Sequence, residues 1–288
     1  MKKQSGFTLI ELMIAGFIGL FLFTGLMNLY ITTNKSVTLS DSLSQNQEAG
    51  RFAMDYLTKF IRRAGYTEDF TAYTPVLFMS PGSINEPITC TGTQVDACAA
   101  NNPNVAPVNV IGDRLSIAMD IGANPEDLTR SCTGTIVGGP ANGVQRIVNV
   151  FWVSSEADTA RQLRCRTFSR DTNDWLDQPT SIINNIERLE FQVGIASNIS
   201  DQSASRYVSV DTIEADPNVD MNFVRSIRVS ILTTSQNDIE EKVQSTSRKR
   251  TYNILDSPVF TIEDTNLRNI FTNTVELPNM IGPAGTGT

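Results

Sequence analysis

A single carboxylate inside a long apolar stretch is the first feature of this sequence that could do chemistry. Between Phe7 and Ile31 the only charged side chain is that of Glu11. A carboxylate within a membrane costs roughly 3 kcal/mol on insertion scales, so it is rarely placed there without a partner. Gly6 precedes the stretch and offers a small residue to a peptidase, whereas no small-residue site of an ordinary secretory signal ends it. The sequence therefore predicts cleavage between Gly6 and Phe7, which leaves a cationic amine on Phe7 that Glu11 can neutralise in its own or a neighbouring chain.

Catalytic and metal-binding patterns are missing from the rest of the sequence. It has no histidine, which removes histidine acid–base catalysis, the usual serine triad and histidine metal ligands. It also has no G-x-x-x-x-G-K-[ST] motif for nucleotide phosphates. The acidic stretch with Asp171, Asn173, Asp174 and Asp177 lacks the glycine and the distal glutamate of an EF-hand loop, so we interpret it as a solvated turn. We therefore expect no enzyme activity, no cofactor and no metal site.

The four cysteines are Cys90, Cys98, Cys132 and Cys165, and they indicate disulfide chemistry. Two lysines before the apolar stretch favour an N-terminus that stays inside the cell while the bulk of the chain is exported to an oxidising compartment. An even count then suggests two disulfides, for which three pairings are possible. We favour a short loop closed by Cys90 and Cys98, with Cys132 and Cys165 forming the second bridge.

One long helix must position these groups. Residues 7–31 are enough apolar helix to cross a hydrocarbon core, which takes about 20 residues, so we expect a transmembrane or filament-core segment there. Residues 32–65 are expected to continue the helix as an amphipathic half, because apolar side chains in 52–64 recur at helical spacing. Gly65 is the expected C-cap. A continuous helix over 7–64 would be about 87 Å long.

The chain beyond this helix predicts a β-rich head. Residues 66–279 alternate strand-like runs with loops rich in Pro, Gly and Asn, and 280–288 are expected to be a disordered tail. We expect about seven mostly antiparallel strands that cover the helix stripe, which gives an α+β fold. The net charge of −8 argues against nucleic-acid binding, which needs clustered Lys and Arg. Strands are expected at 114–119, 147–153, 163–168, 186–195, 224–233, 252–262 and 268–277.

Three stretches of the sequence resemble a known family. The residues G-F-T-L-I-E at 6–11 resemble the class III leader of type IV pilins and of type II secretion pseudopilins. The blocks at 45–66 and 268–279 are similar to the PilW branch of minor pilins. The resemblance implies that residues 1–6 are a leader, that prepilin peptidase cuts between Gly6 and Phe7, and that Phe7 is then N-methylated. It also implies that Glu11 pairs with the N-terminal amine of a subunit.

The resemblance implies a structural function. We expect a minor pilin that helps to prime type IV pilus assembly and lies at the pilus tip. Its expected partners are other minor pilins, the major pilin, prepilin peptidase, the inner-membrane assembly platform and the lipid bilayer. It would sit in the bacterial inner membrane with a periplasmic head and then move to the pilus and the cell surface. Two alternatives stay open, which are a GspJ-like minor pseudopilin of a type II secretion system and a tip adhesin module.

Overall fold

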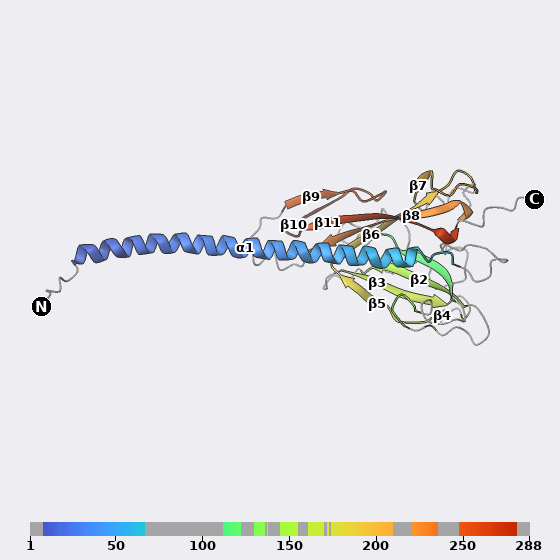
Figure 1. Ribbon diagram of the computed structural model, residues 1–288, viewed down its shortest axis with the longest axis horizontal. Helices are drawn as coiled ribbons and strands as arrows, with labels where there is room; N and C mark the ends of the chain where they lie inside the picture. Colours follow the sequence, from blue (N-terminus) through green and yellow to red (C-terminus); the bar gives the residue numbers. More distant parts are fainter. Residues whose placement is uncertain are drawn as a thin grey trace, which may run out of the picture.

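One long helix carries a head made of β-sheets. The computed structural model describes residues 8–66, 112–121, 130–135, 137, 145–154, 161–169, 172, 174–209, 221–235 and 248–280. The N-terminal part of helix α1 (Leu9–Ile61) projects from the head, and its C-terminal part lies along the head (Figure 1). The expected α+β fold is confirmed.

Helix α1 ends earlier than its sequence pattern predicts. It has 53 residues and stops at Ile61, after which the chain makes turns up to Gly65. Gly65 adopts a φ of +72°, a conformation that suits glycine, and its N–H donates to the carbonyl oxygen of Ala118 at 2.9 Å. The C-cap is Arg62 and not Gly65, so the predicted position of the cap is wrong, and Gly65 instead ends the turns that follow the helix. Its hydrogen bond to Ala118 ties this end of the helix to the head.

A four-stranded antiparallel sheet covers one side of the helix. Its strand order is β11-β8-β6-β7, and β11 pairs with β8 without a register shift, from Arg268 opposite Thr234 to Glu276 opposite Ser226. One short 3₁₀ turn directly precedes β8, and a second follows β11. The bounds are β6 (Ile186–Ile195), β7 (Arg206–Val208), η2 (Met221–Phe223), β8 (Val224–Thr234), β11 (Arg268–Glu276) and η3 (Pro278–Met280).

A second, five-stranded sheet lies on the other side of α1 (Figure 1). Strands β1, β2 and β3 are neighbours in that order, and β4 and β5 both pair with β3. The predicted strand at 252–262 is wrong, because this segment contributes to a hairpin instead, in which β9 pairs with β10. The bounds are β1 (Leu115–Ile121), β2 (Gln145–Val153), β3 (Gln162–Ser169), β4 (Asp174–Trp175), β5 (Thr180–Asn184), β9 (Arg248–Tyr252) and β10 (Phe260–Asp264).

The core lies where the helix stripe meets the inner faces of both sheets. Ala53, Leu57 and Ile61 of α1 are fully buried, so the predicted stripe is confirmed, although Phe52 at its start stays 49% exposed. Gly50 allows α1 to lie close to β11, since a Cβ at this position would be 2.2 Å from the ring of Phe271 on that strand. The same cluster includes Phe191, Val193, Ile227, Val229 and Ile231 of the first sheet and Leu115, Phe151, Val153 and Leu163 of the second.

Candidate assembly site

The N-terminal end of α1 holds the carboxylate that the sequence singles out. Glu11 lies in the first turn, and its Oε2 accepts hydrogen bonds from the backbone N–H of Thr8 at 3.4 Å and from the Thr8 hydroxyl at 3.3 Å. An anion is favoured there because the free N–H groups of a helix start carry partial positive charge. Thr8 directly follows Phe7 in the sequence, so the carboxylate hydrogen-bonds the residue next to the one that would carry the new amine. Gly6 and Phe7 themselves lie outside the described residues.

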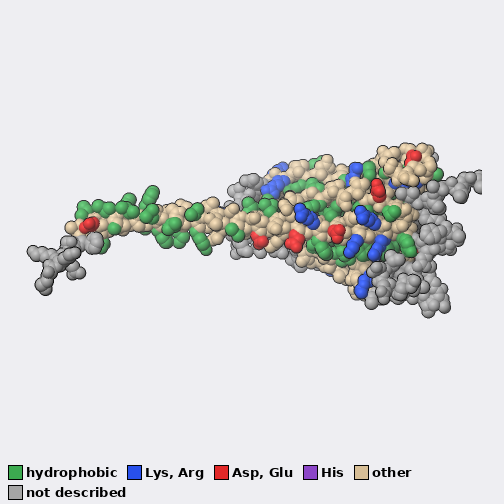
Figure 2. All heavy atoms as spheres, in the orientation of Figure 1, with side chains coloured by type: hydrophobic (Ala, Val, Ile, Leu, Met, Phe, Trp, Pro, Cys, Tyr) green, Lys and Arg blue, Asp and Glu red, His purple; other side chains and the backbone are tan. Residues whose placement is uncertain are grey.

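The projecting part of α1 exposes an apolar surface. The helix is long and apolar enough to cross a membrane, and an 18-residue window with a mean hydropathy of 2.2 has no buried residue. Figure 2 shows hydrophobic side chains around this part of the helix. Large side chains such as Leu9, Phe17 and Phe21 are each more than 70% exposed. Lipid tails or other apolar helices suit such a surface, because water does not solvate it favourably.

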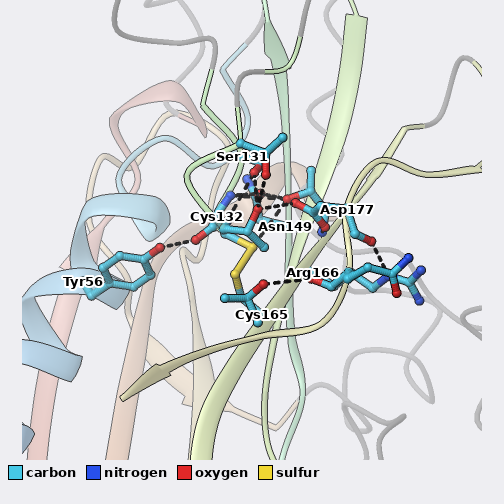
Figure 3. Close-up of a disulfide and its surroundings, with 12 residues drawn as sticks. Tyr56, Ser131, Cys132, Asn149, Cys165, Arg166 and Asp177 are labelled. Atoms are coloured by element: carbon cyan, nitrogen blue, oxygen red, sulfur yellow. Dashed lines mark hydrogen bonds between the residues drawn. A yellow bond between two sulfur atoms is a disulfide. The ribbon is translucent and has the colours of Figure 1, made fainter.

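A disulfide lies directly beneath the helix. Cys132 and Cys165 are bonded, as predicted, and both are fully buried (Figure 3). The bridge ties the segment 130–135 to β3, and the Tyr56 hydroxyl of α1 donates to the carbonyl oxygen of Cys132. Helix, loop and sheet are therefore joined at one point. The other predicted pair, Cys90 and Cys98, lies outside the described residues.

A buried polar network surrounds this disulfide. Asn149 Oδ1 accepts from the backbone N–H of Cys132 at 3.0 Å and from the Thr167 hydroxyl at 2.9 Å. Asp177 Oδ1 accepts from the Thr167 N–H and its Oδ2 from the Thr133 hydroxyl, both at 2.7 Å. Asp177 therefore fixes the loop to β3, and our interpretation of it as part of a solvated turn is wrong. The described residues contain no group of Cys, Asp or Glu side chains that could hold a metal ion.

Tyr56 remains a hydrogen-bond donor at physiological pH. Burial, with a smaller contribution from the negative charge of Asp177, raises the pKa of Tyr56 to about 12. The ring also packs between Phe60 and Phe151, with centroid distances of 5.1 and 6.4 Å. The helix is thus held over the disulfide by both an aromatic cluster and a hydrogen bond.

Replacing both Cys132 and Cys165 with serine should lower the free energy of unfolding by about 3 kcal/mol. The disulfide joins residues that are 33 positions apart in the sequence, and without it the unfolded chain is no longer restricted by this closed loop. Urea unfolding of the detergent-solubilised chain measures this. Thr135→Ala in the same loop is the control and should change stability by less than about 0.5 kcal/mol, because Thr135 is exposed. An equal loss in both variants would contradict a specific contribution of the bridge.

Two buried carboxyl groups lie close together beside β6 of the first sheet. Asp113 Oδ2 accepts from the backbone N–H of Phe191 at 3.0 Å, and the Asp113 N–H donates to the Leu189 carbonyl at 2.6 Å. Glu190 is fully buried and forms an ion pair with Arg188, and its charge acts on Asp113. Two carboxyl groups that are buried near each other are unfavourable when both are ionised. Nothing in the sequence pattern indicated this pair, since Asp113 lies just before the strand expected at 114–119, far from Glu190 in the sequence.

The environment of this pair favours its protonated form. Burial, and then the charge of Glu190, raises the pKa of Asp113 well above its usual range. Burial also raises the pKa of Glu190, although the charge of Arg188 opposes the shift. The pair therefore keeps a proton at a pH where exposed carboxyls have lost theirs.

Stability of the head should fall as the pH rises from about 4 through the raised pKa of this pair. The folded state binds the extra proton and the unfolded state does not, so each proton gives a slope of up to about 1.4 kcal/mol per pH unit. Asp113→Asn imitates the protonated acid and should flatten the slope, as measured by thermal unfolding between pH 4 and 8. Glu276→Gln, at an exposed carboxylate, should leave the slope unchanged. A wild-type slope in Asp113→Asn would refute a proton that the folded state holds at Asp113.

Two protein-family models match the chain. The prokaryotic N-terminal methylation motif matches residues 1–27, which include Gly6, Phe7 and Glu11. Type IV pilus-assembly protein W matches residues 150–279, from within β2 to η3. The second match contains the closing block at 268–279, whereas the block at 45–66 lies outside both matches. No curated protein and no solved structure matches the chain.

Proposed function

Because this chain is a PilW-like type IV pilin, we propose that it is a minor pilin that helps to initiate pilus assembly. Pilins are structural subunits that assemble with other pilus components, and the N-terminal apolar helix anchors this one in a membrane. The observation that carries the proposal is the unburied apolar part of α1, which begins at Leu9, contains Glu11 in its first turn and continues into the head. Such a helix needs either lipid or the helices of other subunits around it.

Processing would prepare this helix for assembly. Prepilin peptidase would cut between Gly6 and Phe7, and the new N-terminal residue Phe7 would be methylated. Glu11 would then neutralise the amine of a neighbouring subunit. The carboxylate is supported in this function by its place in the first helical turn, where it already accepts hydrogen bonds from Thr8.

The membrane anchor and the disulfide indicate where the protein would be located. The head would face the periplasm, where the bridge between Cys132 and Cys165 can form, and would later be carried to the pilus and the cell surface. The partners would be other minor pilins, the major pilin and the inner-membrane assembly platform. The head with its two sheets is wider than the helix that carries it, and this width would limit how many copies a uniform shaft could accept. Such a head suits a few copies in a priming complex or at the tip.

A clean deletion, complemented with the wild-type gene, tests the proposal. Surface pili are counted by electron microscopy, and secreted enzyme activity is measured in the same cultures. Loss of pili with normal secretion supports the minor pilin. Normal pili with blocked secretion would assign the chain to a type II secretion system, and normal pili and secretion with lost attachment would make it a dispensable tip adhesin.

Glu11→Gln should reduce piliation to the level of the deletion, by roughly 100-fold, because the amine of Phe7 would remain unpaired among apolar helices. Pili sheared from complemented cells give the measurement, and an immunoblot of the membranes confirms that the variant is present. Glu276→Gln, on the exposed side of β11, serves as the matched control and should leave piliation unchanged. Normal piliation of Glu11→Gln would rule out the pairing.

A further inference from the structure

Strand β11 forms an edge of the first sheet. It pairs with β8 on one side, and none of the described strands pairs with its other side. The opposite edge of this sheet, β7, has only three residues, whereas β11 has nine. The pairing of β11 with β8 has no register shift, so its open edge is regular over the whole strand.

The pairing with β8 shows which backbone groups of β11 point to the open edge. The N–H of Leu277, directly after β11, donates to the carbonyl oxygen of Arg225 at 2.8 Å, and hydrogen bonds alternate between the two sides of an antiparallel strand. The odd-numbered residues of β11 therefore bond to β8, and the even-numbered ones direct their N–H and C=O groups to the open edge. These even-numbered residues include Ile270, Thr272, Thr274 and Glu276.

Solvent reaches this edge from both faces of the sheet. Successive side chains of a strand point to opposite faces, and the consecutive residues Thr272, Asn273 and Thr274 are all exposed. Ile270 is 44% exposed although it is a large apolar side chain. The central part of the edge is therefore accessible to another molecule.

The edge lacks the features by which proteins usually keep such a strand from pairing. Edge strands are commonly interrupted by proline or a bulge, or they carry charges, lysine in particular. Between Arg268 and Glu276 the strand has no charged residue, no proline and no glycine. Arg268 itself is buried in its ion pairs with Glu187 and Asp264. A regular, uncharged edge with outward N–H and C=O groups is the kind of surface to which an extended segment adds by main-chain hydrogen bonds.

The flank of α1 beside this edge is positively charged. Asn273 Nδ2 donates to the Thr58 hydroxyl at 3.1 Å, which places this side of the helix next to β11. Arg51 and Arg62 lie seven residues before and four residues after Thr58, so they share its side of the helix, together with Asp55. Both arginines are exposed, and neither forms an ion pair with a described residue. Two arginines against one aspartate favour an acidic ligand here.

We propose that the open edge of β11 binds an extended segment of a different protein, which adds a strand to the first sheet and carries acidic side chains toward Arg51 and Arg62. The main chain of this segment pairs with Ile270, Thr272 and Thr274. The two arginines are about 17 Å apart along the helix axis, at 1.5 Å per residue, so a segment that reaches both has at least about five residues.

A second copy of this chain does not fit the edge. Two β11 strands that pair in parallel would bring only one acidic side chain, Glu276, to the two arginines. Two that pair antiparallel would hold their apolar helices in opposite directions, because β11 runs in the same direction as α1, and one membrane cannot anchor both. This second step rests on the proposed function, since it uses the membrane anchor. The contacts that set the direction are Asn46 with Leu267, Thr58 with Asn273 and Ala64 with Asn279.

Site-specific photocrosslinking of the full chain in cells tests the contact. A photoreactive phenylalanine at Thr272, and in a separate variant at Thr274, should give a covalent adduct with the same protein. Peptide mapping should join the two positions to residues two apart in one segment that contains Asp or Glu, because paired strands advance together. Adducts only with a second copy of the chain, adducts at unrelated sites or no adduct would overturn the proposal.

Edge variants test the main-chain pairing. Thr272→Pro removes one outward N–H and keeps the hydrogen bonds to β8, so it should lower the adduct yield from position 274 on the order of tenfold. Thr272→Val retains the N–H and is the matched control. Equal yields in the two variants would overturn strand addition, and the mapped positions of the preceding experiment do not depend on whether Thr272→Pro folds.

A charge variant tests the acidic character of the segment. Arg51→Glu should lower the adduct yield about threefold, because it places a carboxylate beside acidic side chains. Arg206→Glu makes the same change in net charge at an exposed residue of β7, on the far edge of the sheet, and should have no effect. Equal yields in these two variants would overturn the acidic partner.

The two proposals can fail separately. A chain that is required for pili but gives no adduct from the β11 edge would overturn the edge contact and leave the minor-pilin function standing. A mapped strand pairing in a chain that is dispensable for pili would sustain the contact and overturn the function.

Discussion

Replacing Arg225 with methionine is expected to lower the free energy of unfolding by about 4 to 5 kcal/mol, because a buried guanidinium that joins three segments is lost. Arg225 is 2% exposed on β8. Its Nη2 donates to the Ile199 carbonyl and its Nε to the Asp201 carbonyl, both at 2.7 Å. Its Nη1 donates to the carbonyls of Asn222 at 2.6 Å and Met280 at 3.3 Å. Methionine fills similar space but leaves these acceptors without a donor.

The guanidinium of Arg225 cannot be replaced by a smaller cation. The accepting carbonyls come from the loop before β7, from η2 and from η3, so they surround the planar group on several sides. Arg225→Lys retains the charge, but a single ammonium cannot span these positions, and we expect it to recover less than half of the loss. Urea unfolding of the detergent-solubilised chain provides the measurement.

The matched control lies on the same strand. Arg228 stacks over the ring of Tyr207 at 3.7 Å from its centroid and lies on the more open part of β8. Arg228→Met should cost less than about 1 kcal/mol. If Arg225→Met cost no more than Arg228→Met, the carbonyl network would contribute little to stability.

Local signals allowed much of the fold to be predicted. The long apolar run and the stripe at 52–64 specify α1 because helical spacing repeats within the segment itself. The strand predicted at 186–195 coincides with β6, since its apolar residues alternate from Leu189 to Ile195. The expected strand at 268–277 differs from β11 only at its end. Such features depend on neighbours in sequence and not on the rest of the fold.

Other parts of the fold depend on contacts that sequence periodicity does not contain. The alternation in 224–233 predicts one apolar and one polar face, yet Ser226 and Ser230 on the polar face are buried, because other segments cover that face as well. Tyr207 of β7 is a side chain from one of these covering segments. Its hydroxyl accepts a hydrogen bond from the Ser226 hydroxyl at 3.2 Å. Strand order and the division into two sheets likewise follow from long-range pairing, so they could not be derived.

Some features of the candidate site could likewise be predicted from the sequence, and others could not. Gly6, Phe7 and Glu11 form a local motif, which a sequence reveals without any structure. The Cys132–Cys165 pairing was predicted because a short loop was assigned to the other two cysteines. By contrast, the partners of Arg225 are backbone carbonyls up to 55 residues away, and backbone groups leave no signature in the pattern of side chains.

Replacing Arg268 with methionine is expected to lower the free energy of unfolding by about 4 kcal/mol, because it leaves two carboxylates facing each other without their shared cation. The Arg268 side chain is 3% exposed at the start of β11. Its Nε and Nη2 bind the Glu187 oxygens at 2.5 and 2.8 Å, and its Nη1 and Nη2 bind those of Asp264 at 2.7 and 2.6 Å. Burial opposes the charge, but the hydrogen bonds and charges of both carboxylates outweigh it and raise the pKa of Arg268.

This cluster joins β11 and β6 to the β9–β10 hairpin, at the end of the head nearest the projecting part of α1 (Figure 1). Adding Glu187→Gln and Asp264→Asn to Arg268→Met removes the unpaired charges and should recover most of the lost stability, because neutral groups tolerate burial better than isolated ions. If the triple variant were as unstable as Arg268→Met, the loss would come from packing of the arginine stem and not from the two carboxylates that it holds together.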